Sequence, residues 1–175
     1  RMTSTTIHGL ADLDQNGSPD VVYSGNQGTT VVFYDGSQID TSIWLPRYLI
    51  PLNYTSNPNQ FFDINADGKP DLLTMFGSDS MLAYLNQGNQ QFQLVNLDAS
   101  VPVLQNGVLH EVADLDQDGK EDLVIIVHNG SLELSWSKNL GNLNFGPLQA
   151  LFPVPTSDNF GYQSAFDVDQ DGKLD

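Results

Sequence analysis

Alternation of apolar and polar residues recurs along the chain and predicts β-strands. In residues 132–137 (Leu-Glu-Leu-Ser-Trp-Ser) every second side chain is apolar, so an extended segment has one apolar face. The continuous apolar run at 123–127 and the largely apolar segment 72–76 predict buried strands. Turns rich in glycine and asparagine separate these segments. No segment has a sustained helical period with capping residues, so we expect an all-β fold.

The strand pattern repeats about every 51 residues. Each period has a short strand, a polar loop, a buried strand, an alternating strand and a fourth strand, and such four-stranded units are typical of propeller blades. We therefore predict a single β-propeller segment over residues 1–175, built of four-stranded antiparallel blades, with three blades and the start of a fourth. The predicted repeats are about 5–55, 56–106, 107–159 and the incomplete 160–175.

An acidic loop lies between the first two strands of every period. Its third copy, residues 114–122, reads Asp-Leu-Asp-Gln-Asp-Gly-Lys-Glu-Asp, with carboxylates at loop positions 1, 3, 5 and 9 and glycine at position 6. The other copies are residues 12–20, 63–71 and 167–175. Aspartate and glycine are common in turns, so one copy would be weak evidence, but four copies at near-constant spacing form a structural repeat.

Side chains at alternate positions of a tight loop can converge on one hard cation. Calcium takes six to eight oxygen ligands at about 2.3–2.6 Å, and glycine permits the sharp turn. The predicted side-chain ligands, at positions 1, 3, 5 and 9, are Asp12, Asp14, Asn16, Asp20, Asp63, Asn65, Asp67, Asp71, Asp114, Asp116, Asp118, Asp122, Asp167, Asp169, Asp171 and Asp175. We expect up to four calcium ions, one per loop.

The loops differ in charge and also differ from an EF-hand. Asn16 and Asn65 each keep a ligand oxygen but lose a charge, so the first two loops are expected to bind calcium more weakly than the last two. An EF-hand requires glutamate at position 12, where this chain has Tyr23, Thr74 and Ile125.

The formal net charge of −16 is mostly ligand charge. Of 22 acidic residues, 14 lie at positions 1, 3, 5 and 9 of the four loops, so four calcium ions would bring the charge to about −8. Six basic residues cannot build a phosphate-binding stripe, which argues against a nucleic-acid partner. The chain has no cysteine and no run of 18 apolar residues, so disulfides are excluded and this segment has no predicted membrane span.

Other chemistry-bearing residues form no recognisable catalytic motif. The three histidines, His8, His110 and His128, are scattered and are expected to be strand residues, so we expect no enzyme activity. Trp44 and Trp136 are assigned to blade packing. Asn53 and Asn129 begin N-glycosylation sequons and are glycosylation candidates in a secreted protein.

These repeats resemble the FG-GAP/VCBS repeats of integrin α-subunit β-propellers and of many secreted microbial proteins. The resemblance covers nearly the whole chain. It rests on the acidic loops, on Phe-Gly-Tyr-Gln-Ser-Ala-Phe-Asp at 160–167 and on the turn at 85–92. It implies calcium held between the first two strands of a blade, with backbone carbonyls contributed by position 7: Ser18, Lys69, Lys120 and Lys173. No Gly-Ala-Pro follows the second strand, which favours the broader repeat family over integrins proper.

The resemblance and the loops together predict a calcium-stabilised propeller module of an extracellular or cell-surface protein, serving adhesion or protein interaction. Two alternatives stay open: a carbohydrate-binding propeller or accessory part of a polysaccharide-active enzyme, and a structural subunit of an extracellular filament. The chain starts at Arg1 and stops on the last ligand of a loop, so we expect a piece of a longer protein. Its expected partners are the remaining blades or other copies, together with a protein or glycan ligand.

Overall fold

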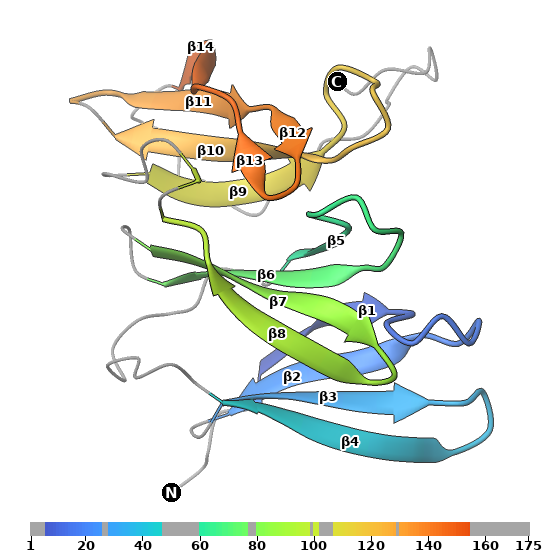
Figure 1. Cartoon of the computed structure of the whole chain (residues 1–175). Coiled ribbons are helices and arrows are strands. Elements are labelled where there is room, and N and C mark those ends of the chain that lie inside the picture. Colours follow the sequence, from blue (N-terminus) through green and yellow to red (C-terminus); the bar gives the residue numbers. More distant parts are fainter. Residues whose placement is uncertain are drawn as a thin grey trace, which may run out of the picture.

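The computed structural model describes residues 6–25, 28–46, 60–76, 80–98, 100–101, 107–128 and 130–154. Within this part of the chain the fold consists of β-strands and turns, and three four-stranded antiparallel sheets lie one against the next (Figure 1). The all-β fold of four-stranded units that the sequence predicts is confirmed. The three sheets do not close into a ring. None of the described segments is a helix of the length and apolar character that crossing a membrane requires.

In each four-stranded sheet the strands pair in chain order, and in the third repeat a separate two-stranded hairpin comes between the third and fourth of them. The first sheet contains β1 (Thr6–Ala11), β2 (Asp20–Gly25), β3 (Gly28–Tyr34) and β4 (Ile39–Pro46). The second contains β5 (Gln60–Phe62), β6 (Asp71–Phe76), β7 (Ser80–Gly88) and β8 (Gln91–Asn96). The third contains β9 (Gly107–Ala113), β10 (Asp122–His128), β11 (Leu132–Ser137) and β14 (Gln149–Val154), with a short hairpin of β12 (Asn139–Gly141) and β13 (Asn144–Phe145).

The hairpin between the third and fourth strands is tighter than the sequence suggests. The turn-forming residues predict a turn at 86–89, but β7 continues through Gly88 and the chain reverses at Asn89 and Gln90, with φ of 50° and 60°. Asn142 and Leu143 occupy the same place between β12 and β13, with φ of 52° and 63°. Two consecutive residues with positive φ match the twist of a two-residue hairpin, so the strands can pair up to the turn itself.

The third sheet departs from the second after this hairpin. The long strands β7 and β8 correspond to strands that are interrupted in the third repeat, where β13 ends at Phe145 and β14 starts at Gln149. The Gly146 N–H donates to the Lys138 carbonyl at 2.8 Å, and the Ser137 hydroxyl donates to the Gly146 carbonyl at 2.7 Å. Pro147 cannot donate to a strand ladder, so the fourth strand restarts beyond it.

Two apolar cores join the three sheets. The first core contains residues of the first and second sheets: Leu13, Val22, Val31, Phe33, Leu45, Leu72 and Tyr84. The second contains residues of the second and third sheets, among them Phe62, Ile64, Leu73, Met81, Leu85, Leu123, Ile125 and Phe145. The middle sheet therefore contributes to both cores.

Adjacent residues of β6 show how the middle sheet packs against both neighbouring sheets. Leu72 belongs to the first core and Leu73 to the second, and each is about 1% exposed. Successive side chains of a strand point to opposite faces, so one continuous apolar run can supply both cores. This stacking of sheets through shared cores is the packing that propeller blades require.

Candidate metal centre

Three described loops connect the first and second strands of the three sheets, and they have nearly the same backbone. At loop position 4, Gln15, Ala66 and Gln117 have φ of 60°, 62° and 61°. At position 6, Gly17, Gly68 and Gly119 have φ of 89°, 84° and 87°. Position 6 lies where a side chain is rarely tolerated, which accounts for glycine in every copy. The sequence repeat is thus also a repeat of conformation.

The aspartate at position 1 holds each loop closed. The two carboxylate oxygens of Asp12 accept the N–H groups of positions 5 and 6, at 3.0 and 2.9 Å. Asp63 does the same at 2.9 and 2.6 Å, and Asp114 at 3.0 and 2.8 Å. A loop with no ladder hydrogen bonds of its own is thereby ordered by one carboxylate.

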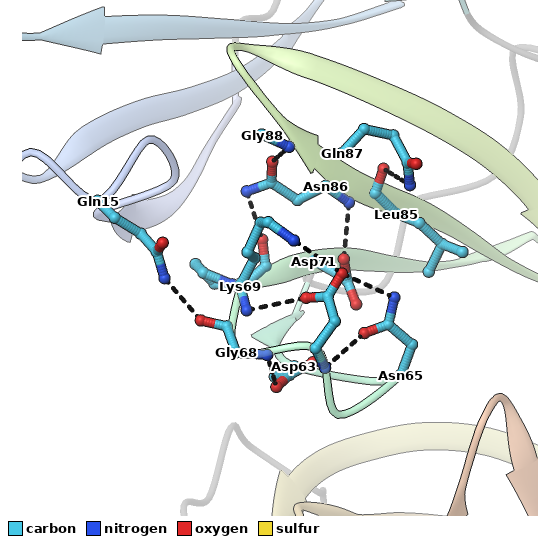
Figure 2. A network of polar contacts seen from close by, with 12 residues as sticks. Gln15, Asp63, Asn65, Gly68, Lys69, Asp71, Leu85, Asn86, Gln87 and Gly88 are labelled. Atoms are coloured by element: carbon cyan, nitrogen blue, oxygen red, sulfur yellow. Dashed lines mark hydrogen bonds and ion pairs between the residues drawn. The ribbon is translucent and has the colours of Figure 1, made fainter.

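The aspartate at position 9 is almost fully buried in each of the three described loops. Asp20, Asp71 and Asp122 are 0%, 1% and 0% exposed. In each, one oxygen accepts the N–H of loop position 2, at 2.8, 3.1 and 3.2 Å. The other oxygen accepts the N–H of Tyr34 in β3, of Asn86 in β7 or of Asn139 in β12, at 2.9, 2.7 and 2.8 Å. This carboxylate therefore ties the loop to the second and third strands, and Figure 2 shows the contact between Asn86 and Asp71.

Burial makes these three carboxylates difficult to ionise. It raises the pKa of Asp71 to about 6, although the backbone hydrogen bonds from Asn86 and Ile64 act in the opposite direction. Burial likewise raises the pKa of Asp20 and of Asp122. The ionised form of a buried carboxylate lacks compensating positive charge, and a cation bound at the loop would provide it.

Carboxylates from positions 1, 3 and 9 converge in two of the described loops. Asp12, Asp14 and Asp20 each offer an oxygen, and these oxygens lie within 4.8 Å of one another. Asp114, Asp116 and Asp122 form the corresponding group in the third loop. These two groups could hold metal ions. In the second loop position 3 is Asn65, whose amide donates to Asp67 at 3.3 Å.

Position 5 makes other contacts. The Asn16 amide donates to the Tyr34 carbonyl at 3.0 Å, and Asp67 pairs with Lys69 at 3.0 Å. Asp118 pairs with Lys120 and with Lys138, each at 2.8 Å. Hydrogen bonds from the side chains of Lys120 and Lys138 lower the pKa of Asp118 to about 2. Lys69 and Lys120, at position 7, therefore pair within their own loops, whereas the metal role of the position 7 carbonyls stays a prediction.

The donor set fits calcium by its chemistry. It consists of carboxylate oxygens with no sulfur and no imidazole among them, and hard oxygen donors are what calcium selects. Among the described residues every buried side-chain polar atom already has a hydrogen-bond partner, so an ion would add to a loop that is already formed.

Several predicted sites lie outside the described residues. These are the fourth loop (167–175) and the sequon residues Asn53 and Asn129. The three histidines do lie on strands, His8 on β1, His110 on β9 and His128 on β10. Trp136 lies on β11 opposite Val124 of β10, while the side chain of Trp44 is outside the description.

The comparison with protein families agrees with the loop repeat. The FG-GAP-like repeat matches residues 12–74, 63–125 and 114–175. The chain belongs to this family. Each matched segment begins at the first aspartate of a loop and includes the next loop. No curated protein matches the chain at a significant level.

Neighbouring FG-GAP repeats are linked by polar contacts as well as by the cores. Asn86, 1% exposed on β7, donates its amide to the Leu13 carbonyl of the first loop at 2.6 Å and to the Pro70 carbonyl at 3.1 Å. Gln15 donates across to the Gly68 carbonyl at 2.6 Å (Figure 2). Gln90 donates to Asp40 at 2.9 Å and, more weakly, to Asp14 at 3.5 Å. The first loop therefore lies in the joint between two repeats.

The sequence contained a signal for one of these residues. Asn86 and Asn139 occupy the same place in an Asn-x-Gly-Asn segment, 53 residues apart, and both donate an N–H to the position 9 aspartate. The turn-forming composition of the segment gives no indication of this buried contact. Lys138 gave no comparable signal, because the matched residue in the second repeat is Leu85.

Proposed function

We propose that this FG-GAP chain is a calcium-stabilised propeller module of an extracellular or cell-surface protein, where it serves protein interaction and calcium has a structural, non-catalytic role. The observation that carries this proposal is the recurrence of one loop conformation with converging carboxylates from positions 1, 3 and 9. Bound calcium would neutralise the clustered negative charge. The loop residues themselves orient the carboxylates and fix the connection between two strands.

The kind of site supports the proposed extracellular setting. These loops offer carboxylate oxygens from one short segment, and extracellular calcium modules of modest affinity have dissociation constants of about 10⁻⁴–10⁻³ M. Such sites are filled where calcium is near millimolar, as it is outside cells. In a cytosol with far less calcium, the same loops would stay largely unfilled.

Interaction as the role of the module is supported by an exposed apolar face. On β1, Ile7 is 69% exposed and Leu10 is 63% exposed. Faces of this kind are covered by neighbours in stacked sheet repeats. We propose that further blades of the same protein, or other copies of it, cover this face, and that a protein or glycan ligand binds the assembled propeller.

Titration calorimetry tests the calcium proposal. We expect calcium to bind at more than one site, with dissociation constants between about 10⁻⁴ and 10⁻³ M. Asp14→Ala should remove one site, whereas Asp40→Ala, an aspartate outside the loops, should leave the number of sites unchanged. No heat of calcium binding up to about 10 mM would contradict the proposal.

The location is tested separately. In the native organism, the protein carrying this module should be labelled by a membrane-impermeant reagent on intact cells or be found in the medium. Labelling only after cell lysis would contradict an extracellular or cell-surface role.

A further inference from the structure

The third loop differs from the first two because a lysine from outside the loop reaches its carboxylates. The ammonium group of Lys138 contacts the Oδ2 atom of Asp116 and lies 2.8 Å from the Oδ2 atom of Asp118. Lys138 follows directly after β11 and is 22 residues from Asp116 in sequence. Its side chain is 30% exposed, as is that of Asp116, so the pair lies at the surface end of the metal group.

The matched positions in the other repeats hold no cation. In each repeat one N–H from the end of the third strand, or from the strand that directly follows it, is donated to the position 9 aspartate, by Tyr34, Asn86 and Asn139. The residues just before these donors are Phe33, Leu85 and Lys138. Phe33 is 0% exposed and Leu85 is 7% exposed, and both belong to the apolar cores. The third repeat therefore has an ammonium group where the others have a core side chain.

Lys138 and Lys120 together reverse the order of charge between the first and third loops. The third loop has four carboxylates at ligand positions, but Lys120 and Lys138 both pair with them, which leaves two net negative charges. The first loop has three ligand carboxylates, and no lysine among the described residues pairs with them. By its ligand carboxylates alone the third loop has more negative charge than the first. After the charges of the paired lysines are subtracted, it has less.

We propose that Lys138 is an internal competitor for calcium at the third loop, so that this loop fills at higher calcium concentration than the first. The inference rests on the proposed calcium function. An arriving ion must displace the ammonium group from Asp116, a ligand at position 3. The displaced lysine then remains nearby and repels the ion. When calcium is low, the same ammonium group neutralises part of the clustered negative charge.

The test uses the position 6 glycines as separate reporters of each loop. Selective ¹⁵N-glycine labelling of the full chain gives signals from 15 glycines. Among them, Gly17, Gly68 and Gly119 each donate their N–H to the position 1 aspartate of their own loop. Calcium binding should shift each signal, so one titration measures the loops independently. In the wild-type chain we expect the Gly119 signal to saturate at higher calcium than the Gly17 signal.

Three variants separate the lysine's position from its charge. Lys138→Met should lower the midpoint of the Gly119 shift by about tenfold and leave Gly17 unchanged. Lys138→Arg keeps the charge and should stay near wild type. Lys120→Met removes an equal charge that contacts Asp118 but not Asp116 in the described contacts, and it should shift Gly119 by about twofold at most. If Lys138→Met without calcium no longer gives the dispersed spectrum of a folded chain, Lys138→Gln replaces it in the test.

The outcomes distinguish this inference from the function on which it rests. If calcium shifts all three glycines but Lys138→Met and Lys138→Gln leave the Gly119 midpoint in place, the competitor role of Lys138 is overturned and calcium binding stands. An equal effect of Lys120→Met and Lys138→Met would also overturn it, because net charge alone would then explain the order. If no glycine shifts up to about 10 mM calcium, both the proposed function and this inference fail.

Discussion

The position 9 aspartates combine two roles in one side chain. Asp20 accepts two backbone N–H groups, from Leu13 and Tyr34, and its carboxylate also belongs to the group that could hold a metal ion. Asp14, at position 3, belongs to the same group but accepts one N–H at 3.3 Å and one weak amide contact at 3.5 Å. The two aspartates are therefore alike as metal ligands and unlike as structural residues.

This difference predicts opposite behaviour of two matched variants. Asp20→Asn presents an N–H₂ group to one of two buried N–H donors, so it should lower the free energy of unfolding by about 1–3 kcal/mol even with chelator present. Asp14→Asn keeps its acceptor oxygen and should change the metal-free stability by less than about 0.5 kcal/mol, while weakening calcium binding. Urea unfolding with and without calcium measures both. Equal losses for both variants in chelator would contradict the separate roles.

Position 4 of the second loop offers a stabilising substitution. Ala66 is exposed and has φ of 62°, in the left-handed region where a Cβ atom is unfavourable. Ala66→Gly should therefore raise the free energy of unfolding by about 1 kcal/mol, partly offset by the greater freedom of glycine in the unfolded chain. Thermal unfolding measures the change, with an alanine-to-glycine substitution at Ala83 of β7 as the destabilising control. A lower melting temperature for Ala66→Gly would contradict the inferred strain.

At the scale of elements, the joint between the first and second repeats depends on one buried amide. Asn86→Ala would leave the Leu13 and Pro70 carbonyls without this donor and the Gly88 N–H without its acceptor at 2.9 Å. We expect a loss of about 2–3 kcal/mol in urea unfolding. The exposed neighbour Gln87 is the matched control, and Gln87→Ala should change stability by less than about 0.5 kcal/mol. Similar effects of the two substitutions would show that the joint relies on the apolar core alone.

Much of this architecture could be predicted because its causes are local. Apolar runs such as 123–127 fix a buried strand, and the spacing of aspartates and glycine fixes the loop conformation, so both can be read from neighbouring residues. The pairing of Lys138 with Asp116 spans 22 residues and replaces a core position of the other repeats, so no local pattern indicates it. The same is true of the Asn86 contact with Leu13, which joins two repeats. The interruption between β13 and β14 follows from Gly146 and Pro147, whose effect on pairing depends on the neighbouring strand.

At the scale of the whole molecule, the FG-GAP repeats form a stack whose stability is shared between cores and charged loops. Burial of apolar side chains in the two cores stabilises the packing of the sheets. Electrostatic repulsion from a net charge of −16, concentrated in the loops, destabilises the compact state. Calcium at the loops would remove part of this repulsion and bind only the folded chain. Ligands that bind the folded state stabilise it by about 2.7 kcal/mol per site at a concentration 100 times the dissociation constant.

The most direct measurement is therefore the melting temperature of the chain in calcium and in chelator, compared with a variant that lacks the position 3 ligand in every loop (Asp14→Ala, Asn65→Ala, Asp116→Ala and Asp169→Ala). Calcium at about 10 mM should raise the wild-type melting temperature by at least about 5 °C, since several sites contribute. The variant should melt at nearly the same temperature in both conditions. A wild-type melting temperature that is the same in calcium and in chelator would contradict a structural role for calcium in these repeats.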